Sequence, residues 1–213
     1  MNITKDQDQE LVLKLIKQFY PISSISQQSL IDFVNYLIIY NSSTNLIGKS
    51  TVEQIWHRHI LDSAQLLPLI NNKNDIIADF GSGAGFPGLV LSILGSKEVH
   101  LVEKSTKKSQ FLHQAKKFSI NKVIIHNRKV EELTDLKCKC IVSRALASLD
   151  KLLLLSINLL KNSPKSYCLF LKGRNYKAEI IEAQQKFKFD YQLFPSITAN
   201  DSFIIKVENI ILR

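Results

Sequence analysis

The segment that most restricts the possible folds is a glycine-rich stretch, residues 79–88, with the sequence DFGSGAGFPG. It lies between a run typical of a strand and a run typical of a helix, and Gly83, Gly85 and Gly88 have the spacing G-x-G-x-x-G. Glycines in a turn between a strand and a helix let a ligand approach the backbone. Glu103 closes the next apolar run, where an acidic residue binds ribose hydroxyls in this arrangement. The two features together predict a site for a ligand that contains adenosine.

The glycine motif leaves the chemistry of that ligand open. A dinucleotide and S-adenosylmethionine both place an adenosine over the same strand ends, so a nucleotide-dependent oxidoreductase and a methyltransferase are alternatives at this point. A P-loop is disfavoured because no G-x-x-x-x-G-K-[ST] element follows the glycines. No hydride-transfer residues stand out, and Asp79 is placed to face the cationic part of S-adenosylmethionine.

The chain after residue 72 alternates between strand-like and helix-like patterns. Short apolar runs predict strands at residues 75–80, 98–103, 122–126, 140–143 and 166–171. Helix patterns lie between these runs and after the last one, at residues 86–94, 106–118, 130–134, 148–160 and 175–188. Such alternation predicts an α/β fold with a mostly parallel, Rossmann-like sheet and helices on both faces. Two final runs, 189–194 and 202–211, have no helix between them and predict an antiparallel hairpin on the sheet edge.

The first part of the chain is predicted to be helical. From Asp6 to about residue 70, apolar residues recur at three- and four-residue spacings. Ser26 is the expected N-cap of the second helix, and a third helix is expected over residues 51–67. We therefore divide the chain into an N-terminal helical extension, residues 1–72, and a main domain, residues 73–213, and expect the two to pack as one unit.

The composition is that of a folded protein without a membrane span. Hydrophobic residues make up 45% and charged residues 22% of the chain, and the longest strongly apolar stretch, 152–160, is far shorter than the ~20 residues of a membrane-spanning helix. The first ten residues, MNITKDQDQE, lack the pattern of a secretory signal, so we expect a cytoplasmic protein. The odd number of cysteines favours reduced thiols, and the spacing of Cys138, Cys140 and Cys168 predicts no metal site.

Basic residues outnumber acidic ones. Lys and Arg number 28 against 19 Asp and Glu, which gives a net charge of +9 and favours a polyanionic partner, above all nucleic acid. An ordinary basic enzyme is the alternative, because net charge alone identifies no partner. Lysines gather after the second strand, where they form either an RNA-facing patch or a solvated helix face; they are Lys104, Lys107, Lys108, Lys116, Lys117 and Lys122.

Four segments of the sequence together resemble one protein family. They are Asn45-Leu46 with Arg58-His-Ile-Leu-Asp-Ser63; Asp79 to Gly88; Lys107-Lys-Ser-Gln-Phe-Leu112; and Ser143-Arg-Ala145 with Leu171-Lys-Gly173. The chain thereby resembles the bacterial small-subunit (16S) ribosomal RNA guanine-N7 methyltransferases, also called the glucose-inhibited division protein B family, over essentially its whole length. The resemblance implies a class I methyltransferase fold and the transfer of a methyl group from S-adenosylmethionine to N7 of a guanine in small-subunit ribosomal RNA.

The resemblance also implies which residues contact the cofactor. Those that match family contacts or belong to the glycine motif are Gly81, Gly83, Phe86, Glu103, Val130, Glu131 and Arg144. The chain departs from the family at one basic residue of the cofactor site. The family's R-x-E appears as Lys129-Val-Glu131, with Arg128 one position early, so either Arg128 or Lys129 is the expected equivalent. Glu103 stands where relatives often have Asp.

For this chemistry we expect positioning rather than acid–base catalysis. Guanine N7 already exposes a lone pair, so no proton has to be removed and no catalytic acid or base is assigned. Arg144 ends the fourth strand at the edge where ligands bind and is the expected positioning residue. His59 and Asp62 share a helix face and either orient the RNA or lock the extension onto the main domain. The expected RNA contacts are Lys172, Lys107, Lys108, His59 and Asp62.

The sequence leaves the state of the substrate open. Naked RNA, an assembling particle and a mature ribosomal subunit all fit the charge and the motifs, and the target guanine is not identified. We expect a monomer. A noncatalytic RNA-binding or ribosome assembly factor with the same fold is a further alternative, which only an activity measurement excludes.

Overall fold

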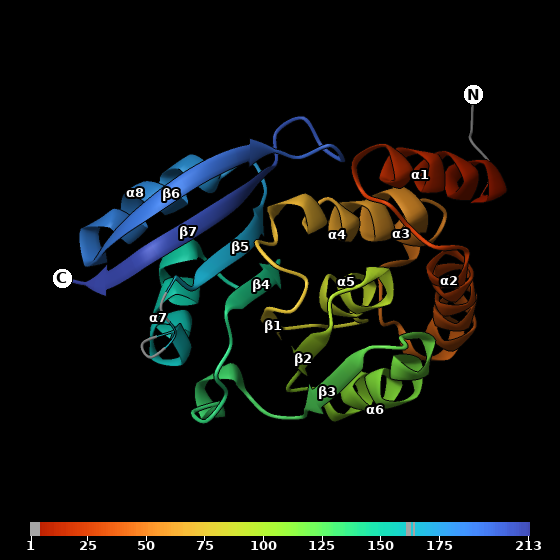
Figure 1. The fold of residues 1–213 in the computed structure, drawn as a ribbon, viewed down its shortest axis with the longest axis horizontal. Helices are drawn as coiled ribbons and strands as arrows, with labels where there is room; N and C mark the ends of the chain where they lie inside the picture. Colours follow the sequence, from red (N-terminus) through yellow and green to blue (C-terminus); the bar gives the residue numbers. More distant parts are fainter. Residues whose placement is uncertain (1–4, 161–162, 164) are drawn as a thin grey trace.

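The computed structural model describes residues 5–160, 163 and 165–213. Residues 1–4, part of the first ten residues that lack a secretory-signal pattern, lie outside the described residues. Its centre is a seven-stranded sheet with the strand order β3-β2-β1-β4-β5-β7-β6 (Figure 1). Strands β1 to β5 run parallel, whereas β7 is antiparallel to both β5 and β6. The predicted α/β sheet with its terminal hairpin is therefore confirmed. The strands are β1 Ile76–Phe80, β2 Glu98–Val102, β3 Lys122–His126, β4 Cys140–Arg144, β5 Tyr167–Lys172, β6 Phe187–Pro195 and β7 Phe203–Leu212.

Helices cover both faces of this sheet. Because side chains alternate along a strand, Ile77 and Val142 belong to one apolar cluster, whereas Ala78 and Ile141 belong to another. The first cluster includes residues of α5 (Gly88–Leu94) and α6 (Thr106–Ala115), which continues into the 3-10 helix η3 (Lys116–Phe118). The second includes residues of α7 (Leu149–Leu160) and α8 (Tyr176–Lys186). Burial on both faces explains why the central strands are apolar runs without alternation.

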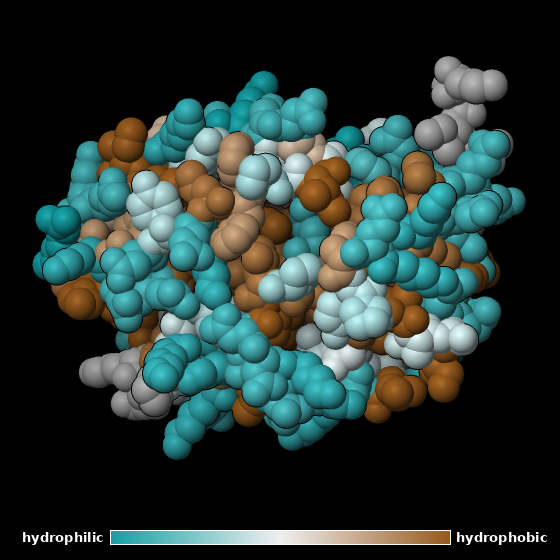
Figure 2. All heavy atoms as spheres, turned by 45° about the horizontal axis from the view of Figure 1, so that its top comes forward, coloured by the Kyte–Doolittle hydropathy of each residue, from teal (hydrophilic) through white to brown (hydrophobic). Residues whose placement is uncertain are grey.

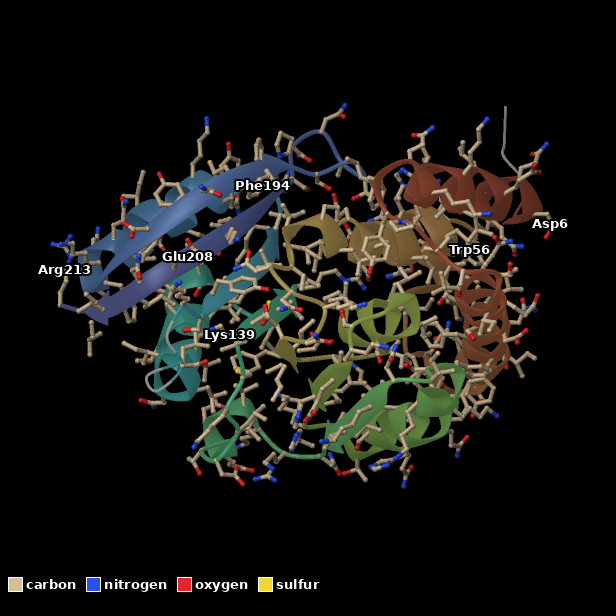
Figure 3. The ribbon with its side chains drawn as sticks, viewed as in Figure 1. Asp6, Trp56, Lys139, Phe194, Glu208 and Arg213 are labelled. Carbon is tan, nitrogen blue, oxygen red and sulfur yellow. The ribbon has the colours of Figure 1, made fainter. Side chains whose placement is uncertain are left out.

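The helical extension shares its core with the first face of the sheet. Phe33 and Trp56, both fully buried, join the cluster that holds α5 and α6. Trp56 lies in the segment that packs against α1 (Figure 3). Apolar burial therefore connects the extension to the sheet. The extension consists of α1 Lys5–Phe19, α2 Ser24–Thr44, α3 Lys49–Val52, the π-helix η1 Trp56–Leu61, α4 Asp62–Ala64 and the 3-10 helix η2 Leu67–Leu69.

Two details of the predicted helices are wrong. The N-cap of α2 is Ser23 rather than Ser26, because Ser23 has extended backbone and its Oγ accepts a hydrogen bond from the Ser26 N–H at 3.0 Å. The helix thus begins one turn earlier than expected. The third predicted helix, residues 51–67, is divided into several short pieces, with the π-helix η1 at its centre. A π-helix has one more residue per hydrogen-bonded ring than an α-helix, and such insertions are frequent at functional sites.

Among the described residues, no helix is long and apolar enough to cross a membrane, and no group of three or more acidic, histidine or cysteine side chains is arranged to hold a metal ion. Cys138, Cys140 and Cys168 are buried free thiols. Burial raises the pKa of the Cys138 thiol to about 12, so this side chain is a neutral part of the core.

Candidate functional site

The glycine loop is fixed at the carboxyl edge of the sheet. Gly81, Gly83 and Gly85 have φ angles of 73°, 55° and 95°, a region that favours glycine. The N–H groups of Gly81 and Ser82 donate to the carbonyl of Val102 at 2.9 and 3.1 Å. Since Val102 ends β2, these bonds hold the loop beside the position at which the acidic residue follows that strand.

Glu103, directly after β2, supports the loop from the side of the expected ribose. Its carboxylate accepts hydrogen bonds from the Gly83 N–H at 3.0 Å and from the Ser105 N–H at 2.8 Å, one on each oxygen. The residue is buried. Each oxygen keeps a second lone pair, so the carboxylate can also accept hydroxyl groups of a ligand. The sequence placed Glu103 at this point, but its bond to Gly83 is visible only in the structure.

Asp79, at the end of β1, leaves a buried oxygen without a partner. Its Oδ2 accepts a hydrogen bond from the Gly88 N–H at 2.9 Å. Ser82 Oγ donates to the backbone carbonyl of Asp79 at 3.0 Å, and Oδ1 has no hydrogen-bond partner among the described residues. Burial raises the pKa of Asp79 to about 7. A buried acceptor of this kind fits a ligand with positive charge above the loop.

Gly88 shows how tightly the loop packs beneath the ligand position. A Cβ atom built on Gly88 would lie 2.5 Å from Leu101 Cδ2 and 2.7 Å from Asp79 Oδ2. A side chain there would displace the side chains of Leu101 and Asp79. The glycine is therefore needed for close packing of α5 against the sheet, which is the role of the third glycine in nucleotide-binding loops.

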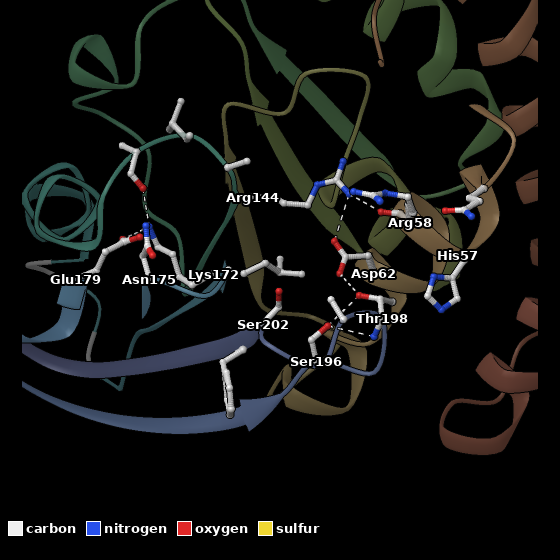
Figure 4. Close-up of a pocket in the computed structure, with 18 of the residues that line it drawn as sticks. His57, Arg58, Asp62, Arg144, Lys172, Asn175, Glu179, Ser196, Thr198 and Ser202 are labelled. Carbon is white, nitrogen blue, oxygen red and sulfur yellow. Dashed lines mark hydrogen bonds and ion pairs between the residues drawn. The ribbon is translucent and has the colours of Figure 1, made fainter. Parts of the chain in front are cut away.

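Arg144, the last residue of β4, connects the sheet edge to the helical extension. Its Nη1 donates to the carbonyl of Arg58 at 3.1 Å and to Asp62 Oδ2 at 3.3 Å (Figure 4). Its Nη2 donates to His59 Nδ1 at 2.8 Å. The guanidinium carbon also lies 5.1 Å from the centre of the Phe86 ring. Arg144 is thus held in place by four neighbours.

His59 is a neutral acceptor for Arg144. Because Nδ1 accepts from Arg144, the ring proton lies on Nε2, which donates to Thr51 Oγ1 at 3.0 Å. Burial, together with the charges of Arg144 and Arg58, lowers the pKa of His59 to about 3. The ring stacks on Phe86 with centres 4.9 Å apart. The histidine therefore orients the arginine and the loop.

Asp62 links Arg144 to the hairpin loop, residues 196–202. Its Oδ1 accepts hydrogen bonds from Thr198 Oγ1 at 2.7 Å and from Gln65 Nε2 at 2.9 Å. Gln65 in turn accepts from the Ile197 N–H at 3.0 Å. Sequence reasoning missed Gln65 and Thr198, because more than a hundred residues separate these partners and no short motif contains both.

A cleft of about 1300 Å³ lies between α8 and the part of the sheet edge where Arg144, Asp62 and Thr198 are connected. Figure 2 shows apolar atoms between hydrophilic surfaces on this side of the molecule. Leu146 lines the cleft and also lies against the glycine loop, since a Cβ on Gly81 would be 2.8 Å from Leu146 Cδ1. The cleft therefore adjoins the loop. Other lining residues include His57, Arg58, Asp62, Arg144, Lys172, Asn175, Glu179, Glu182, Ser196 and Thr198.

The remaining predicted site residues lie in different environments. Lys172 ends β5, is buried, and pairs with Glu179 Oε2 at 2.7 Å, so a phosphate would have to compete with that carboxylate. Lys107 is exposed and Lys108 half-buried on the first turn of α6. Val130 is half-buried and Glu131 exposed in the 3-10 helix η4 (Val130–Glu132). In the described part of the chain, the cleft lining includes no residue of α6 or η4. Arg128 and Lys129 are both exposed, so exposure does not distinguish them.

Two solved methyltransferase structures are similar to this fold. A ribosomal protein L11 methylase from Lactobacillus delbrueckii subsp. bulgaricus aligns with a TM-score of 0.58 and 18% identity over 72% of this chain and 79% of its own. The magnesium protoporphyrin IX methyltransferase of Synechocystis PCC 6803, solved with bound SAM, aligns with a TM-score of 0.55 and 14% identity over 85% and 97%. At this identity the likeness establishes the fold.

Sequence comparison is more specific. The GidB family, described as rRNA small subunit methyltransferase G, matches residues 26–202. The protein named ribosomal RNA small subunit methyltransferase G in Orientia tsutsugamushi (strain Boryong) is 40% identical over 92% of this chain and 99% of its own length. Its namesake in Rickettsia felis is 41% identical over 80% and 87%. The chain therefore belongs to the rRNA small subunit methyltransferase G family.

Proposed function

We propose that this protein transfers the methyl group of S-adenosylmethionine to N7 of a guanine in small-subunit ribosomal RNA. The observation that carries the proposal is the glycine loop, with Glu103 beside it, next to a cleft large enough for a nucleotide. Family membership supports the RNA substrate, and a structural neighbour solved with SAM supports the cofactor. A nucleotide-dependent oxidoreductase is not favoured by either comparison.

The cofactor site in this proposal is the loop and the strand ends around it. The unpartnered Asp79 Oδ1 and the free lone pairs of Glu103 fit a ligand with a cation at one end and ribose hydroxyls at the other. S-adenosylmethionine supplies a methyl group on a positively charged sulfur. The proposed contacts are Gly81, Gly83, Phe86, Glu103, Val130, Glu131 and Arg144, with Phe86 contributing backbone because its ring is covered by His59 and Arg144.

The protein's contribution to the reaction is positioning. Guanine N7 attacks with its own lone pair, so no side chain has to remove a proton. Arg144 is fixed by Arg58, His59 and Asp62 at the junction of the loop and the cleft, where it holds the substrate edge in place. A preorganised cation at that point needs no rearrangement when the base arrives.

The proposed RNA contacts divide into two groups. Lys107 and Lys108 are available at the surface for phosphates. His59 and Asp62 accept hydrogen bonds from Arg144, so we propose that they position Arg144. We propose that Lys172 contacts the RNA from its position beside Glu179, with which it forms an ion pair. We also propose that the protein acts as a monomer. Sedimentation analysis of the purified protein tests this by measuring its molar mass in solution.

The deciding experiment compares ribosomal RNA from cells with and without this gene by mass spectrometry of modified guanosines. We expect one 7-methylguanosine in small-subunit RNA to disappear with the gene and to return when purified protein and S-adenosylmethionine are added. An unchanged modification pattern would refute the proposal. Protein that binds the RNA but restores no methyl group would indicate a noncatalytic assembly factor. Calorimetric titration with S-adenosylhomocysteine and with nicotinamide dinucleotides tests the ligand class separately.

A further inference from the structure

A carboxylate in the cleft provides a basis for recognising the target base. We infer that Glu179 accepts hydrogen bonds from the Watson–Crick edge of the target guanine and thereby selects guanine over other bases. Glu179 lies on α8, lines the cleft and is half-buried. The inference rests on the proposed function and names the substrate contact of the same site.

One oxygen of Glu179 is used by the protein and the other is open. Oε2 accepts a hydrogen bond from Lys172 Nζ at 2.7 Å (Figure 4). It also accepts one from the Leu149 N–H at 2.8 Å. Oε1 has no hydrogen-bond partner among the residues that the structure describes. Two donors on one oxygen fix the plane of the carboxylate, and the buried Lys172 balances its charge. The second oxygen is thus an oriented acceptor at the cleft wall.

An acidic wall does not serve the RNA backbone. Phosphates are repelled by a carboxylate, whereas the chain as a whole has a net charge of +9. A carboxylate is an acceptor only. Guanine presents two neighbouring donors, N1–H and the N2 amino group, on its Watson–Crick edge, whereas adenine and cytosine present a ring-nitrogen acceptor there. Enzymes that modify a base extrude it and read this edge by hydrogen bonds.

The position of Glu179 also suits attack by N7. The N7 atom lies on the side of the purine away from N1 and N2. In the sheet, β4 and β5 are neighbours, with Arg144 paired to Leu171, and Leu146 lies against Gly81. We therefore place the guanine across these two strand ends, with its Watson–Crick edge at α8 and its N7 toward Arg144 and the glycine loop.

The test replaces the target guanosine by inosine, which keeps N7 and N1–H and lacks the N2 amino group. The substrates are small-subunit RNAs assembled by ligation, with either nucleoside at the position mapped by mass spectrometry. We expect the wild-type protein to have a kcat/KM about 10- to 100-fold higher for guanosine, as for removal of a hydrogen bond to a charged group. In Glu179→Gln, the amide oxygen keeps the bonds from Leu149 and Lys172 and turns the NH₂ toward the base, so the ratio should fall to near one.

The matched control is Glu182→Gln, which removes the same charge from an exposed residue of α8 in the same cleft and should keep the wild-type ratio. If Glu179→Gln does not fold, Glu179→Asp withdraws the carboxylate by one methylene and should lose the discrimination as well. A wild-type ratio near one, or a full ratio in a folded Glu179 variant, overturns the inference while methylation of natural RNA still supports the proposed function. Failure of the wild type on every RNA overturns both.

Discussion

At the scale of single residues, Glu103 supports the loop through its bond to Gly83 and is a proposed contact of the cofactor. Glu103→Ala is expected to weaken S-adenosylhomocysteine binding by about 1 to 3 kcal/mol, the usual effect of removing a charged hydrogen-bond partner. Because Glu103 lies away from the cleft lining, RNA affinity should not change. Calorimetry measures the first quantity and filter binding the second, with Glu132→Ala on η4 as a control of equal charge. Reduced RNA affinity with intact ligand binding would contradict the assignment.

Asp79 gives a prediction about pH. Its pKa is raised by burial from 3.8 to about 7, so between these values the folded protein holds a proton that the unfolded chain has released. The contribution of this group to stability is therefore greatest below about pH 4 and decreases as pH rises toward 7. Asp79→Asn keeps an acceptor for the Gly88 N–H, and should match the wild type near pH 4 and exceed its free energy of unfolding at pH 8. Urea titrations across this range measure the difference, and a difference independent of pH would show that Asp79 is ionised throughout.

At the scale of elements, the junction of β4 with η1 determines where Arg144 points. Arg144→Ala removes the bonds to Arg58, His59 and Asp62 together, and we expect methyl transfer to fall about a hundredfold, as for a misplaced reacting group. Affinity for RNA should change little. Single-turnover assays with saturating RNA measure the rate of methyl transfer. Asp62→Asn, which keeps one accepting oxygen, replaces the other by an NH₂ donor and removes the ion pair, should give a smaller decrease. Full turnover in Arg144→Ala would contradict the proposed role of Arg144 in positioning the substrate.

The same junction shows which features of the protein are predictable from its sequence. The strands, the glycine loop and the place of Arg144 at a strand end follow from local periodicity and motifs. The partners of Arg144 do not, because His59 and Asp62 are more than eighty residues away in the sequence. The π-helix is not predictable for a different reason, because apolar spacing at three and four residues does not distinguish it from an α-helix. Tertiary contacts determine the partners of Arg144.

At the scale of the whole molecule, the charge predicts how binding depends on salt. The affinity for small-subunit RNA should decrease steeply with salt concentration, because neutralising phosphates releases counterions. Combined Lys107→Ala and Lys108→Ala should flatten the logarithmic slope by about one unit for each phosphate that these lysines neutralise in the wild type. Lys151→Ala with Lys188→Ala removes the same charge from exposed sites on α7 and β6 and is the control. Equal slopes in all three proteins would show that the α6 lysines are solvated and that RNA binds elsewhere.

The strand order has a consequence for synthesis of the protein on the ribosome. Strand β7 lies between β5 and β6, although it follows both in the chain. Until residues 203–212 have left the exit tunnel, β5 has an unpaired edge, and an open edge is prone to pair with other chains. The loop that Asp62 holds through Thr198 is also anchored only when both flanking strands are in place. Emergence of β7 from the tunnel therefore completes the sheet and anchors this loop at the cleft, so nascent chains in which this strand is not yet free are exposed to aggregation.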